Sequence, residues 1–284
     1  MKLVRHDSEV EIIGIDDFDL AKTFECGQCF RWNADENGAY TGVAMGRAAS
    51  VYRRGGGDGE KGSIFISCTA NDFETVWRDY FDLDRDYAAI RKQLGADGFM
   101  RKASEYGAGI RILRQDGWEA LCSFIISQCN NIPRIKKIIA SLCQNFGERL
   151  DFNGSAHHSF PSARKLAALE ERDLTPIRCG YRAAYILDSA RAVANGDIDL
   201  EALSQVTPFD ARKTLKGIRG VGDKVADCVL LYGLHMLDSF PLDVWMKRAV
   251  AKYYGPDFDA GMFSPYAGIA QQYLFHYIRH HSDE

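Results

Sequence analysis

The hydrophobic period of the sequence changes near residue 72, and this change most constrains the fold. Before it, short strand-like runs are separated by Gly, Asn and Asp turns. The runs are EIIGI, CFRW, YTGVAM, ASVYRR and SIFISC, all between about residues 10 and 70. They predict an antiparallel sheet. After residue 72, apolar residues recur at helical spacing, so the sequence predicts an α+β protein.

The helical part is longer than the sheet part. A helix over 117–128 is apolar nearly all round, and Pro133 suits the first turn of a second helix over 134–146. Further helices are expected over 162–171, 182–196, 223–232, 243–255 and 265–281. We expect a small antiparallel sheet domain in residues 1–108, packed on a larger helical domain in residues 109–284. Residues 85–110 are interpreted as connecting helices, and the GGGDGEKG run at 55–62 as a hairpin loop.

Composition narrows the class of protein. The chain has 284 residues, of which 46% are hydrophobic and 26% charged, as in ordinary soluble globular proteins. It has no apolar run of membrane-spanning length, and its first 20 residues are too acidic for a signal peptide. We therefore expect a monomer without a membrane partner, cytoplasmic in a bacterium or nuclear in a eukaryote. The net charge of −4 disfavours nucleic-acid binding overall, but residues 213–224 and 132–137 are locally basic.

Eight cysteines are scattered through the chain, which favours reduced thiols over a disulfide framework. Cys26 and Cys29 have the spacing of a zinc or redox pair. No second pair lies at a useful distance, and the seven histidines do not complete one. We expect neither a metal nor a cofactor.

A glycine-rich turn at 215–228, LKGIRGVGDKVADC, leads into a helix that carries Lys224 in its first turn. The amide groups there already carry partial positive charge, so they disfavour an ammonium ion and favour a phosphate oxygen. One interpretation is a solvated surface lysine. The other is an amine whose pKa is depressed, so that it can form a Schiff base. Cys228 lies one turn later and is expected to line the same cavity.

The same stretch, followed by FPLDVWMKR (240–248), resembles the hairpin and trailing aspartate of the helix-hairpin-helix DNA glycosylases. The resemblance implies Lys224 and Asp243 as the catalytic pair, with Gly220 and Gly222 in the DNA-binding hairpin. Asp243 also fits an N-cap position, and the two roles are compatible because a capping carboxylate stays ionised. Such an anion would stabilise positive charge on the sugar as the base departs.

Two further stretches resemble the 8-oxoguanine DNA glycosylases within that superfamily: FECGQCFRW (24–32) and PYAGIAQQYLF (265–275). The first implies that the Gly27 carbonyl accepts a hydrogen bond from N7–H of the oxidised base. Ordinary guanine has only an acceptor there, so the carbonyl would repel it. The second implies that Gln271 bonds the Watson–Crick edge and Phe275 stacks on the base, with Cys228 on its opposite face.

SFIISQCNNIPRI (123–135) and CGYRAAY (179–185) resemble the segments that fill the vacated stack and contact the orphaned cytosine. The implied DNA-contacting residues are Asn131, Arg134, Tyr181 and Arg182. Cys129 stands where the family usually has an asparagine, which leaves the strictness for cytosine open. Trp245 stands where many relatives have histidine, and its indole N–H could still donate to a phosphate. A C-terminal four-cysteine cluster is lacking, which disfavours the iron–sulfur relatives.

Together these matches imply a bifunctional DNA glycosylase and abasic-site lyase of base excision repair. Its partner would be double-stranded DNA containing 8-oxoguanine, preferably opposite cytosine. Two alternatives stay open: a glycosylase on the same scaffold that removes alkylated or oxidised pyrimidine bases, and a hairpin-containing DNA-binding module without catalysis.

Overall fold

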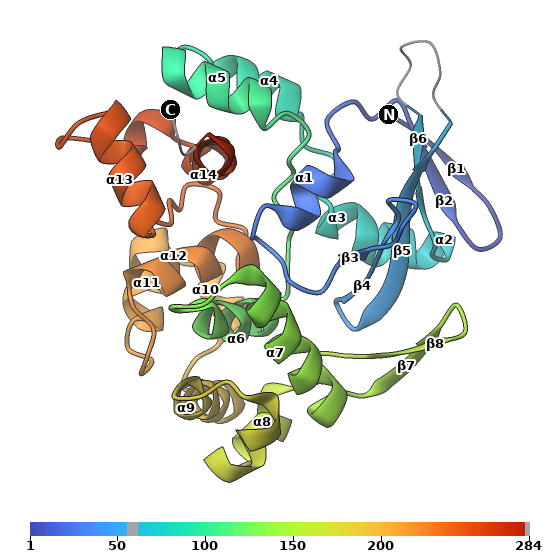
Figure 1. The fold of residues 1–284 in the computed structure, drawn as a ribbon, viewed down its shortest axis with the longest axis vertical. Coiled ribbons are helices and arrows are strands. Elements are labelled where there is room, and N and C mark those ends of the chain that lie inside the picture. The colour runs from blue at the N-terminus through green and yellow to red at the C-terminus, as the bar shows by residue number, and fades with distance from the viewer. Residues whose placement is uncertain (56–61, 282–284) are drawn as a thin grey trace.

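A six-stranded antiparallel sheet forms one side of the molecule, and helices form the rest (Figure 1). The computed structural model describes residues 1–55 and 62–281. The strand order is β1-β2-β6-β5-β4-β3. The strands are β1 (Lys2–Arg5), β2 (Val10–Ile13), β3 (Asn33–Ala34), β4 (Tyr40–Ala44), β5 (Arg47–Arg54) and β6 (Ser63–Ile66). β5 and β6 pair as a hairpin, although residues 56–61 of the expected loop lie outside the described residues.

The strand expected over CFRW is wrong. Residues 29–32 form no strand, and pairing with β4 begins only at Asn33. The physical reason is that this segment serves two cores. Cys29 and Trp32 are buried under the sheet, whereas Phe30 is buried among the helices. A regular strand places residues three apart on opposite faces, so it could not direct both Cys29 and Trp32 into the core under the sheet.

Helices make up most of the remaining chain, and the seven expected helical segments at 117–281 all contain one. In chain order the helical elements are α1 (Leu20–Glu25), α2 (Ala70–Asp72), η1 (Phe73–Trp77), α3 (Arg78–Tyr80), α4 (Tyr87–Leu94), α5 (Gly98–Tyr106), α6 (Gly117–Ser127), α7 (Ile132–Phe146), α8 (Ala163–Ala167), η2 (Glu171–Ile177), α9 (Arg182–Ala194), α10 (Leu200–Leu203), α11 (Pro208–Leu215), α12 (Asp223–Cys228), η3 (Val229–Gly233), α13 (Val244–Tyr253), η4 (Ala260–Phe263) and α14 (Ala267–His280). The described part of the chain contains no helix that is both long and apolar enough to cross a membrane.

Several elements were not expected, among them α1 and a hairpin between α7 and α8. α1 begins at Leu20 and is capped by Asp19, whose side chain accepts a hydrogen bond from the amide of Lys22. A two-stranded hairpin, β7 (Arg149–Phe152) and β8 (Ser155–His158), turns at Asn153-Gly154, where both residues have positive φ. That pair is a recognised hairpin turn, but the flanking strands are only half-buried and lack a clear apolar alternation.

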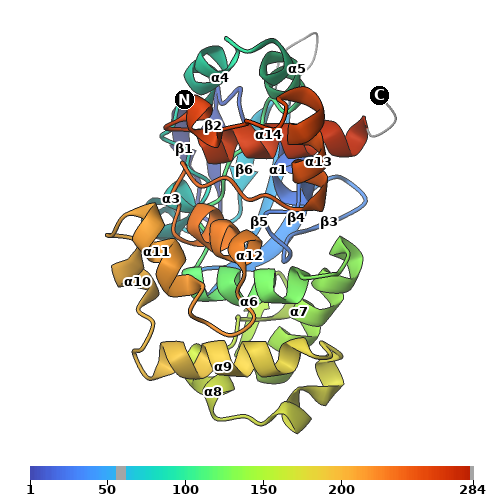
Figure 2. The same cartoon turned by 90° about the vertical axis from the view of Figure 1, so that its left-hand side faces the viewer.

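The apolar side chains form two cores. The smaller lies under the sheet, where Phe24 stacks on Trp32 at 4.6 Å between ring centres. The larger joins the helices and includes Tyr87 and Ile90 of α4 and Met100 of α5. The expected domain boundary at residue 108 therefore falls after two helices that share the helical core. Figure 2 shows α4 and α5 beside α14, and α5 packs against α14.

An ion pair joins the two parts of the molecule. Arg31 donates to Glu119 of α6 at 2.9 Å, and the two side chains are 10% and 14% exposed. Arg31 also donates to the carbonyl of His158. Burial raises the pKa of the Glu119 carboxyl, and the neighbouring guanidinium opposes this shift. The pair therefore joins the loop before β3 to the helices.

Replacing Arg31 with Met should destabilise the protein, because Glu119 would lose its partner while staying buried. We expect the free energy of unfolding to fall by about 3 kcal/mol, measured by urea denaturation. The matched control is the double variant Arg31→Met with Glu119→Gln, which should recover part of the loss. A double variant no more stable than the single variant would contradict this account.

Candidate active site

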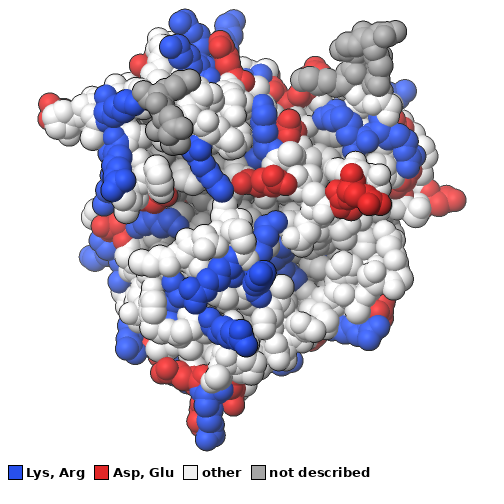
Figure 3. Space-filling view, in the orientation of Figure 1, with Lys and Arg blue, Asp and Glu red and all other residues white. Residues whose placement is uncertain are grey.

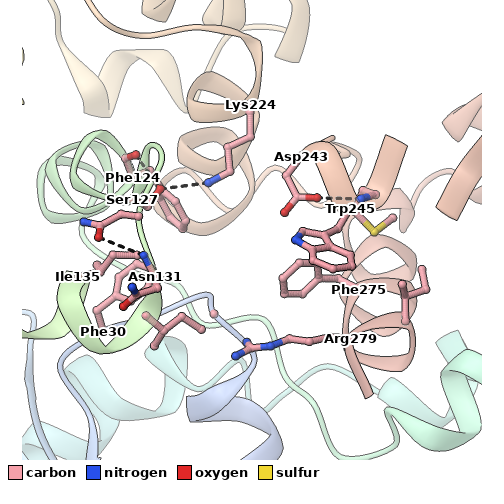
Figure 4. Close-up of a pocket in the computed structure, with 15 residues that line it drawn as sticks. Phe30, Phe124, Ser127, Asn131, Ile135, Lys224, Asp243, Trp245, Phe275 and Arg279 are labelled. Carbon is pink, nitrogen blue, oxygen red and sulfur yellow. Dashed lines mark hydrogen bonds between the residues drawn. The ribbon is translucent and has the colours of Figure 1, made fainter. Parts of the chain in front are cut away.

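A cavity of about 390 Å³ opens between the segment after α1, the loop from α6 to α7, and the helices α12, α13 and α14 (Figure 4). Its wall combines aromatic rings with a few polar groups. The lining residues are Gly27, Phe30, Phe124, Ser127, Asn130, Asn131, Ile132, Ile135, Lys224, Asp243, Trp245, Met246, Phe275, Ile278 and Arg279. Lys224, Asp243, Gly27 and Phe275, expected on the basis of resemblance, thus meet at one cavity.

The turn between α11 and α12 needs its glycines. Gly220 has φ of +84°, and a Cβ added there would lie 2.3 Å from the ring of Tyr185. Gly222 has extended backbone and precedes the first residue of α12. Asp223, in that first turn, forms an ion pair with Lys216 at 2.5 Å. A negative charge is favourable at this end of a helix, so Asp223 offsets the unfavourable placement of Lys224.

The Lys224 side chain points into the cavity. Its Nζ donates a hydrogen bond to Ser127 Oγ at 3.1 Å and lies 5.1 Å from the centre of the Phe124 ring. The residue is half-buried. Lys224 is therefore not a freely solvated surface lysine, because its ammonium group contacts the Phe124 ring and the Ser127 hydroxyl of α6.

Asp243 lies across the cavity from Lys224 (Figure 4). Its Oδ1 accepts a hydrogen bond from the amide of Met246 at 2.8 Å, so it is the N-cap of α13. Capping holds the carboxylate at the cavity wall. The cap and a charge-stabilising role are therefore compatible, as expected from the sequence.

Gly27 and Phe275 meet at another side of the cavity. Gly27 has φ of +88°, and a Cβ placed on it would lie 3.7 Å from both Phe275 and Ile132. The neighbouring Gln272 donates to the carbonyl of Cys26 at 3.1 Å. The sequence interpretation missed this contact, since the adjacent Gln271 was expected to be the functional glutamine. Gln272 therefore ties α14 to the residue before Gly27.

Cys228 and Gln271 lie behind the cavity wall, and neither is among the residues that border it in the described part of the chain. They are 3% and 5% exposed. Burial raises the pKa of the Cys228 thiol to about 11, and the ammonium group of Lys224 opposes this shift. The thiol is thus neutral at neutral pH. Gln271 Oε1 accepts a hydrogen bond from Tyr232 at 3.5 Å. Their expected contacts with a base stay predictions.

The Cys26–Cys29 pair lacks the surroundings of a metal site. Both thiols are buried, and burial raises the pKa of Cys26 to about 12. Within residues 1–55 and 62–281, no group of three or more His, Cys, Asp or Glu side chains is arranged to hold a metal ion.

Most of the residues expected to contact the opposite strand are exposed. Tyr181 is 55% exposed, and Arg134 is exposed in the first turn of α7. Asn131 caps α7 by accepting from the amide of Arg134 at 3.0 Å. Cys129 is exposed and has φ of +47°. The indole of Trp245 is 58% exposed and borders the cavity.

Arg182 has a role that the sequence did not reveal. It is 3% exposed, and its guanidinium donates to the carbonyls of Gln128 and Cys129, at 3.0 and 3.2 Å, and of Cys179 at 3.2 Å. It therefore holds the loop between α6 and α7. The expected contact with cytosine stays a prediction, and it requires these bonds to open.

The chain has a net charge of −4, but basic side chains gather on one face of the molecule. Figure 3 shows Lys and Arg side chains gathered over α7 and around a hollow in the same face. Sequence interpretation also missed several cavity residues, among them Phe124, Ser127 and Arg279. Arg279 follows Phe275 by one helical turn, a spacing that could have indicated it.

Two protein families match adjoining parts of the chain. Residues 12–121 match the N-terminal domain of 8-oxoguanine DNA glycosylase, and residues 122–260 match the HhH-GPD superfamily base excision DNA repair protein. The join falls inside α6, which contributes to the larger core.

Individual relatives agree with these matches. An N-glycosylase/DNA lyase of Saccharomyces cerevisiae is 34% identical, over 83% of this chain and 68% of the relative. An N-glycosylase/DNA lyase OGG1 of Arabidopsis thaliana is 30% identical, over 90% of this chain and 76% of the relative.

Solved structures share the whole fold. One of MBOgg1 in complex with a low-affinity DNA ligand has a TM-score of 0.93 and 42% identity, and it covers 100% of both chains. The 8-oxoguanine glycosylase/lyase of Clostridium acetobutylicum, in complex with double-stranded DNA containing cytosine opposite 8-oxoG, has a TM-score of 0.92 and 36% identity over 99% of both chains. By sequence and fold, the chain belongs to the 8-oxoguanine DNA glycosylase family of helix-hairpin-helix base excision repair proteins.

Proposed function

We propose that this protein removes 8-oxoguanine from double-stranded DNA and then cleaves the strand at the abasic site. The observation that carries the proposal is the placement of Lys224 and Asp243 on opposite sides of one cavity whose wall also holds Gly27 and Phe275 (Figure 4). A base inside a duplex cannot reach such a cavity, so the damaged nucleotide must swing outward.

Lys224 is the nucleophile in this mechanism. In its neutral form, Nζ attacks C1′ of the sugar, and the C1′–N9 bond breaks as the new C–N bond forms. The departing base takes up a proton and the amine loses one. The sugar ring opens to an imine held by Lys224. Loss of a proton from C2′ then expels the 3′ phosphate, which nicks the strand.

The surrounding groups support this chemistry. Ser127 and Phe124 orient the Lys224 side chain through the hydrogen bond and the ring contact. The Asp243 carboxylate, kept at the wall by its cap, stabilises the positive charge that develops on the sugar. Phe275 provides a ring for the extrahelical base to stack on. The carbonyl of Gly27 distinguishes N7–H of the oxidised base from the N7 lone pair of guanine.

The glycine hairpin binds the DNA backbone, and exposed residues near α7 and α9 contact the opposite strand. The backbone amides after Gly220 lead into the N-terminus of α12, and such a helix end suits a phosphate oxygen whatever the DNA sequence. Tyr181 and Arg134 are exposed, as a wedge and a contact to the opposite cytosine require. Whether Cys129 allows other bases opposite the lesion is tested by measuring excision with each of the four.

Replacing Lys224 with Gln should abolish covalent capture of DNA. Borohydride reduction of wild type on a duplex with 8-oxoguanine opposite cytosine should give a covalent protein–DNA product. Lys224→Gln has no amine, so it should give none while still binding the duplex. The readout is a denaturing gel. A wild type that excises the base but forms no adduct would contradict the imine mechanism.

Base-release measurements on duplexes that carry different damaged bases separate the alternative functions. A glycosylase for alkylated or oxidised pyrimidine bases would turn over duplexes carrying those bases faster than the 8-oxoguanine duplex. A binding module without catalysis would release no base from any of them.

Replacing Asp243 with Asn should slow base release by about 100-fold or more, because the charge is lost. The Asn side-chain oxygen still caps α13, so thermal stability should change little. Single-turnover excision and thermal unfolding measure the two effects. Asp243→Ala is the comparison that loses both charge and cap. Equal excision rates for wild type and Asp243→Asn would exclude a role for the charge.

Replacing Gly220 with Ala should weaken DNA binding about tenfold or more and destabilise the fold, since the new methyl group would overlap the ring of Tyr185. Gly222 is the matched control. It has a negative φ and no atom within 4 Å of an added Cβ. Gly222→Ala should therefore unfold close to the wild-type temperature. Similar thermal stability of all three proteins would contradict the steric argument.

A further inference from the structure

Arg279 is a cation at the cavity that the mechanism leaves without a role. It lies on α14 and borders the same cavity as Lys224 and Asp243, and Figure 4 shows its side chain extending from the helix along the cavity. It is exposed. The residue therefore has the freedom to contact a molecule that enters.

Among residues 1–55 and 62–281, the side chain of Arg279 has no hydrogen-bond or ion-pair partner. Nineteen other ion pairs are formed there, and none includes Arg279. By contrast, the other cation at the cavity, Lys224, is hydrogen-bonded to Ser127. Asp243, the carboxylate at the cavity, already accepts the amide of Met246. The donors of the Arg279 guanidinium are thus available to a ligand.

Two observations place Arg279 at the Gly27 end of the cavity. Arg279 follows Phe275 by one helical turn, so the two side chains share a face of α14. A Cβ on Gly27 would lie 3.7 Å from the Phe275 ring.

The hydrogen-bonding groups of the oxidised base match those at the Gly27 end of the cavity. Guanine presents two acceptors on its Hoogsteen edge, N7 and O6. In 8-oxoguanine N7 carries a hydrogen and stands between two carbonyl oxygens, O6 and O8. An edge of this kind needs one acceptor between donors. The carbonyl of Gly27 is an acceptor, and a guanidinium beside it supplies donors in a planar fork.

We propose that Arg279 is a specificity-determining residue that donates to a carbonyl oxygen flanking N7–H of the extrahelical base, next to the contact made by Gly27. This rests on the proposed function, since it names a further contact with the same substrate. Gly27 rejects the N7 lone pair of guanine, and Arg279 adds affinity for the oxidised base. A phosphate is the competing ligand for an exposed arginine, and binding measurements distinguish the two.

The test measures affinity by fluorescence anisotropy at fixed salt, in a Lys224→Gln background that prevents cleavage. Arg279→Gln in this background is compared on two duplexes, one with 8-oxoguanine opposite cytosine and one with a tetrahydrofuran abasic analogue. We expect about a tenfold loss of affinity on the 8-oxoguanine duplex and a loss of no more than about threefold on the abasic duplex. Arg279→Lys keeps the positive charge but not the planar fork of donors. Its affinity for the 8-oxoguanine duplex should lie between those of the background protein and Arg279→Gln.

Arg101→Gln is the matched control. It makes the same charge change at an exposed arginine of α5 that does not border the cavity, and it should leave both affinities unchanged. Equal losses on the two duplexes for Arg279→Gln, with a salt dependence reduced by about one phosphate contact, would assign Arg279 to the DNA backbone and overturn the inference. No loss on either duplex would also overturn it.

These outcomes are separable from failure of the proposed function. If wild type excises 8-oxoguanine while Arg279→Gln binds the lesion as tightly as the background protein, only the role of Arg279 is wrong. If wild type neither prefers nor excises the lesion, the proposed function itself fails. Thermal unfolding of each variant verifies that it is folded.

Discussion

The geometry of the cavity depends on a single buried amide, the side chain of Gln28. It is fully buried, and its Nε2 donates to the carbonyls of Thr23 and Arg111 at 2.9 and 2.7 Å, while its Oε1 accepts from the amide of Leu113 at 2.9 Å. Buried polar groups of this kind are costly unless satisfied, so the bonds specify one arrangement. Gln28 thereby locks the α1 end to the chain entering α6, and Gly27, its neighbour, is held at the cavity with the left-handed backbone that glycine tolerates.

Three helix N-termini complete the site around that anchor. α12 presents Lys224, α13 is capped by Asp243, and α7 is capped by Asn131. Helix N-termini stabilise anions, which suits both a carboxylate at the wall and the phosphates of a strand laid across it. The same field disfavours a protonated amine, and the hydroxyl of Ser127 and the ring of Phe124 offset this by orienting the ammonium group. Arg182 in turn holds the loop that follows Ser127, so the proposed nucleophile and the residues expected to contact the opposite strand adjoin the same loop.

Local sequence patterns predicted seven helical segments between residues 117 and 281, because each segment contains its own start, stop or apolar-face signals. Pro133 in the first turn, the glycines at 217–222 and the apolar faces of α6, α9 and α14 depend on neighbours within a few residues. Local patterns gave a wrong prediction where the side chains of one short segment are buried against elements far away in the chain. Residues 29–32 look like a strand, yet they serve two cores. β7 and β8 lack a clear alternation because both strands are largely exposed.

The sequence by itself determined the α+β class, the glycine hairpin, and the chemical types at positions 27, 224, 243 and 275, because these follow from residue identity and short-range spacing. Only the tertiary structure decided which side chains face the cavity. It placed Cys228 and Gln271 behind the wall, turned Arg182 onto backbone carbonyls and left Arg279 without a described partner at the Gly27 end. The physical reason is that helical spacing specifies a face of a helix, whereas the depth and partners of each side chain on that face depend on elements far away in the chain.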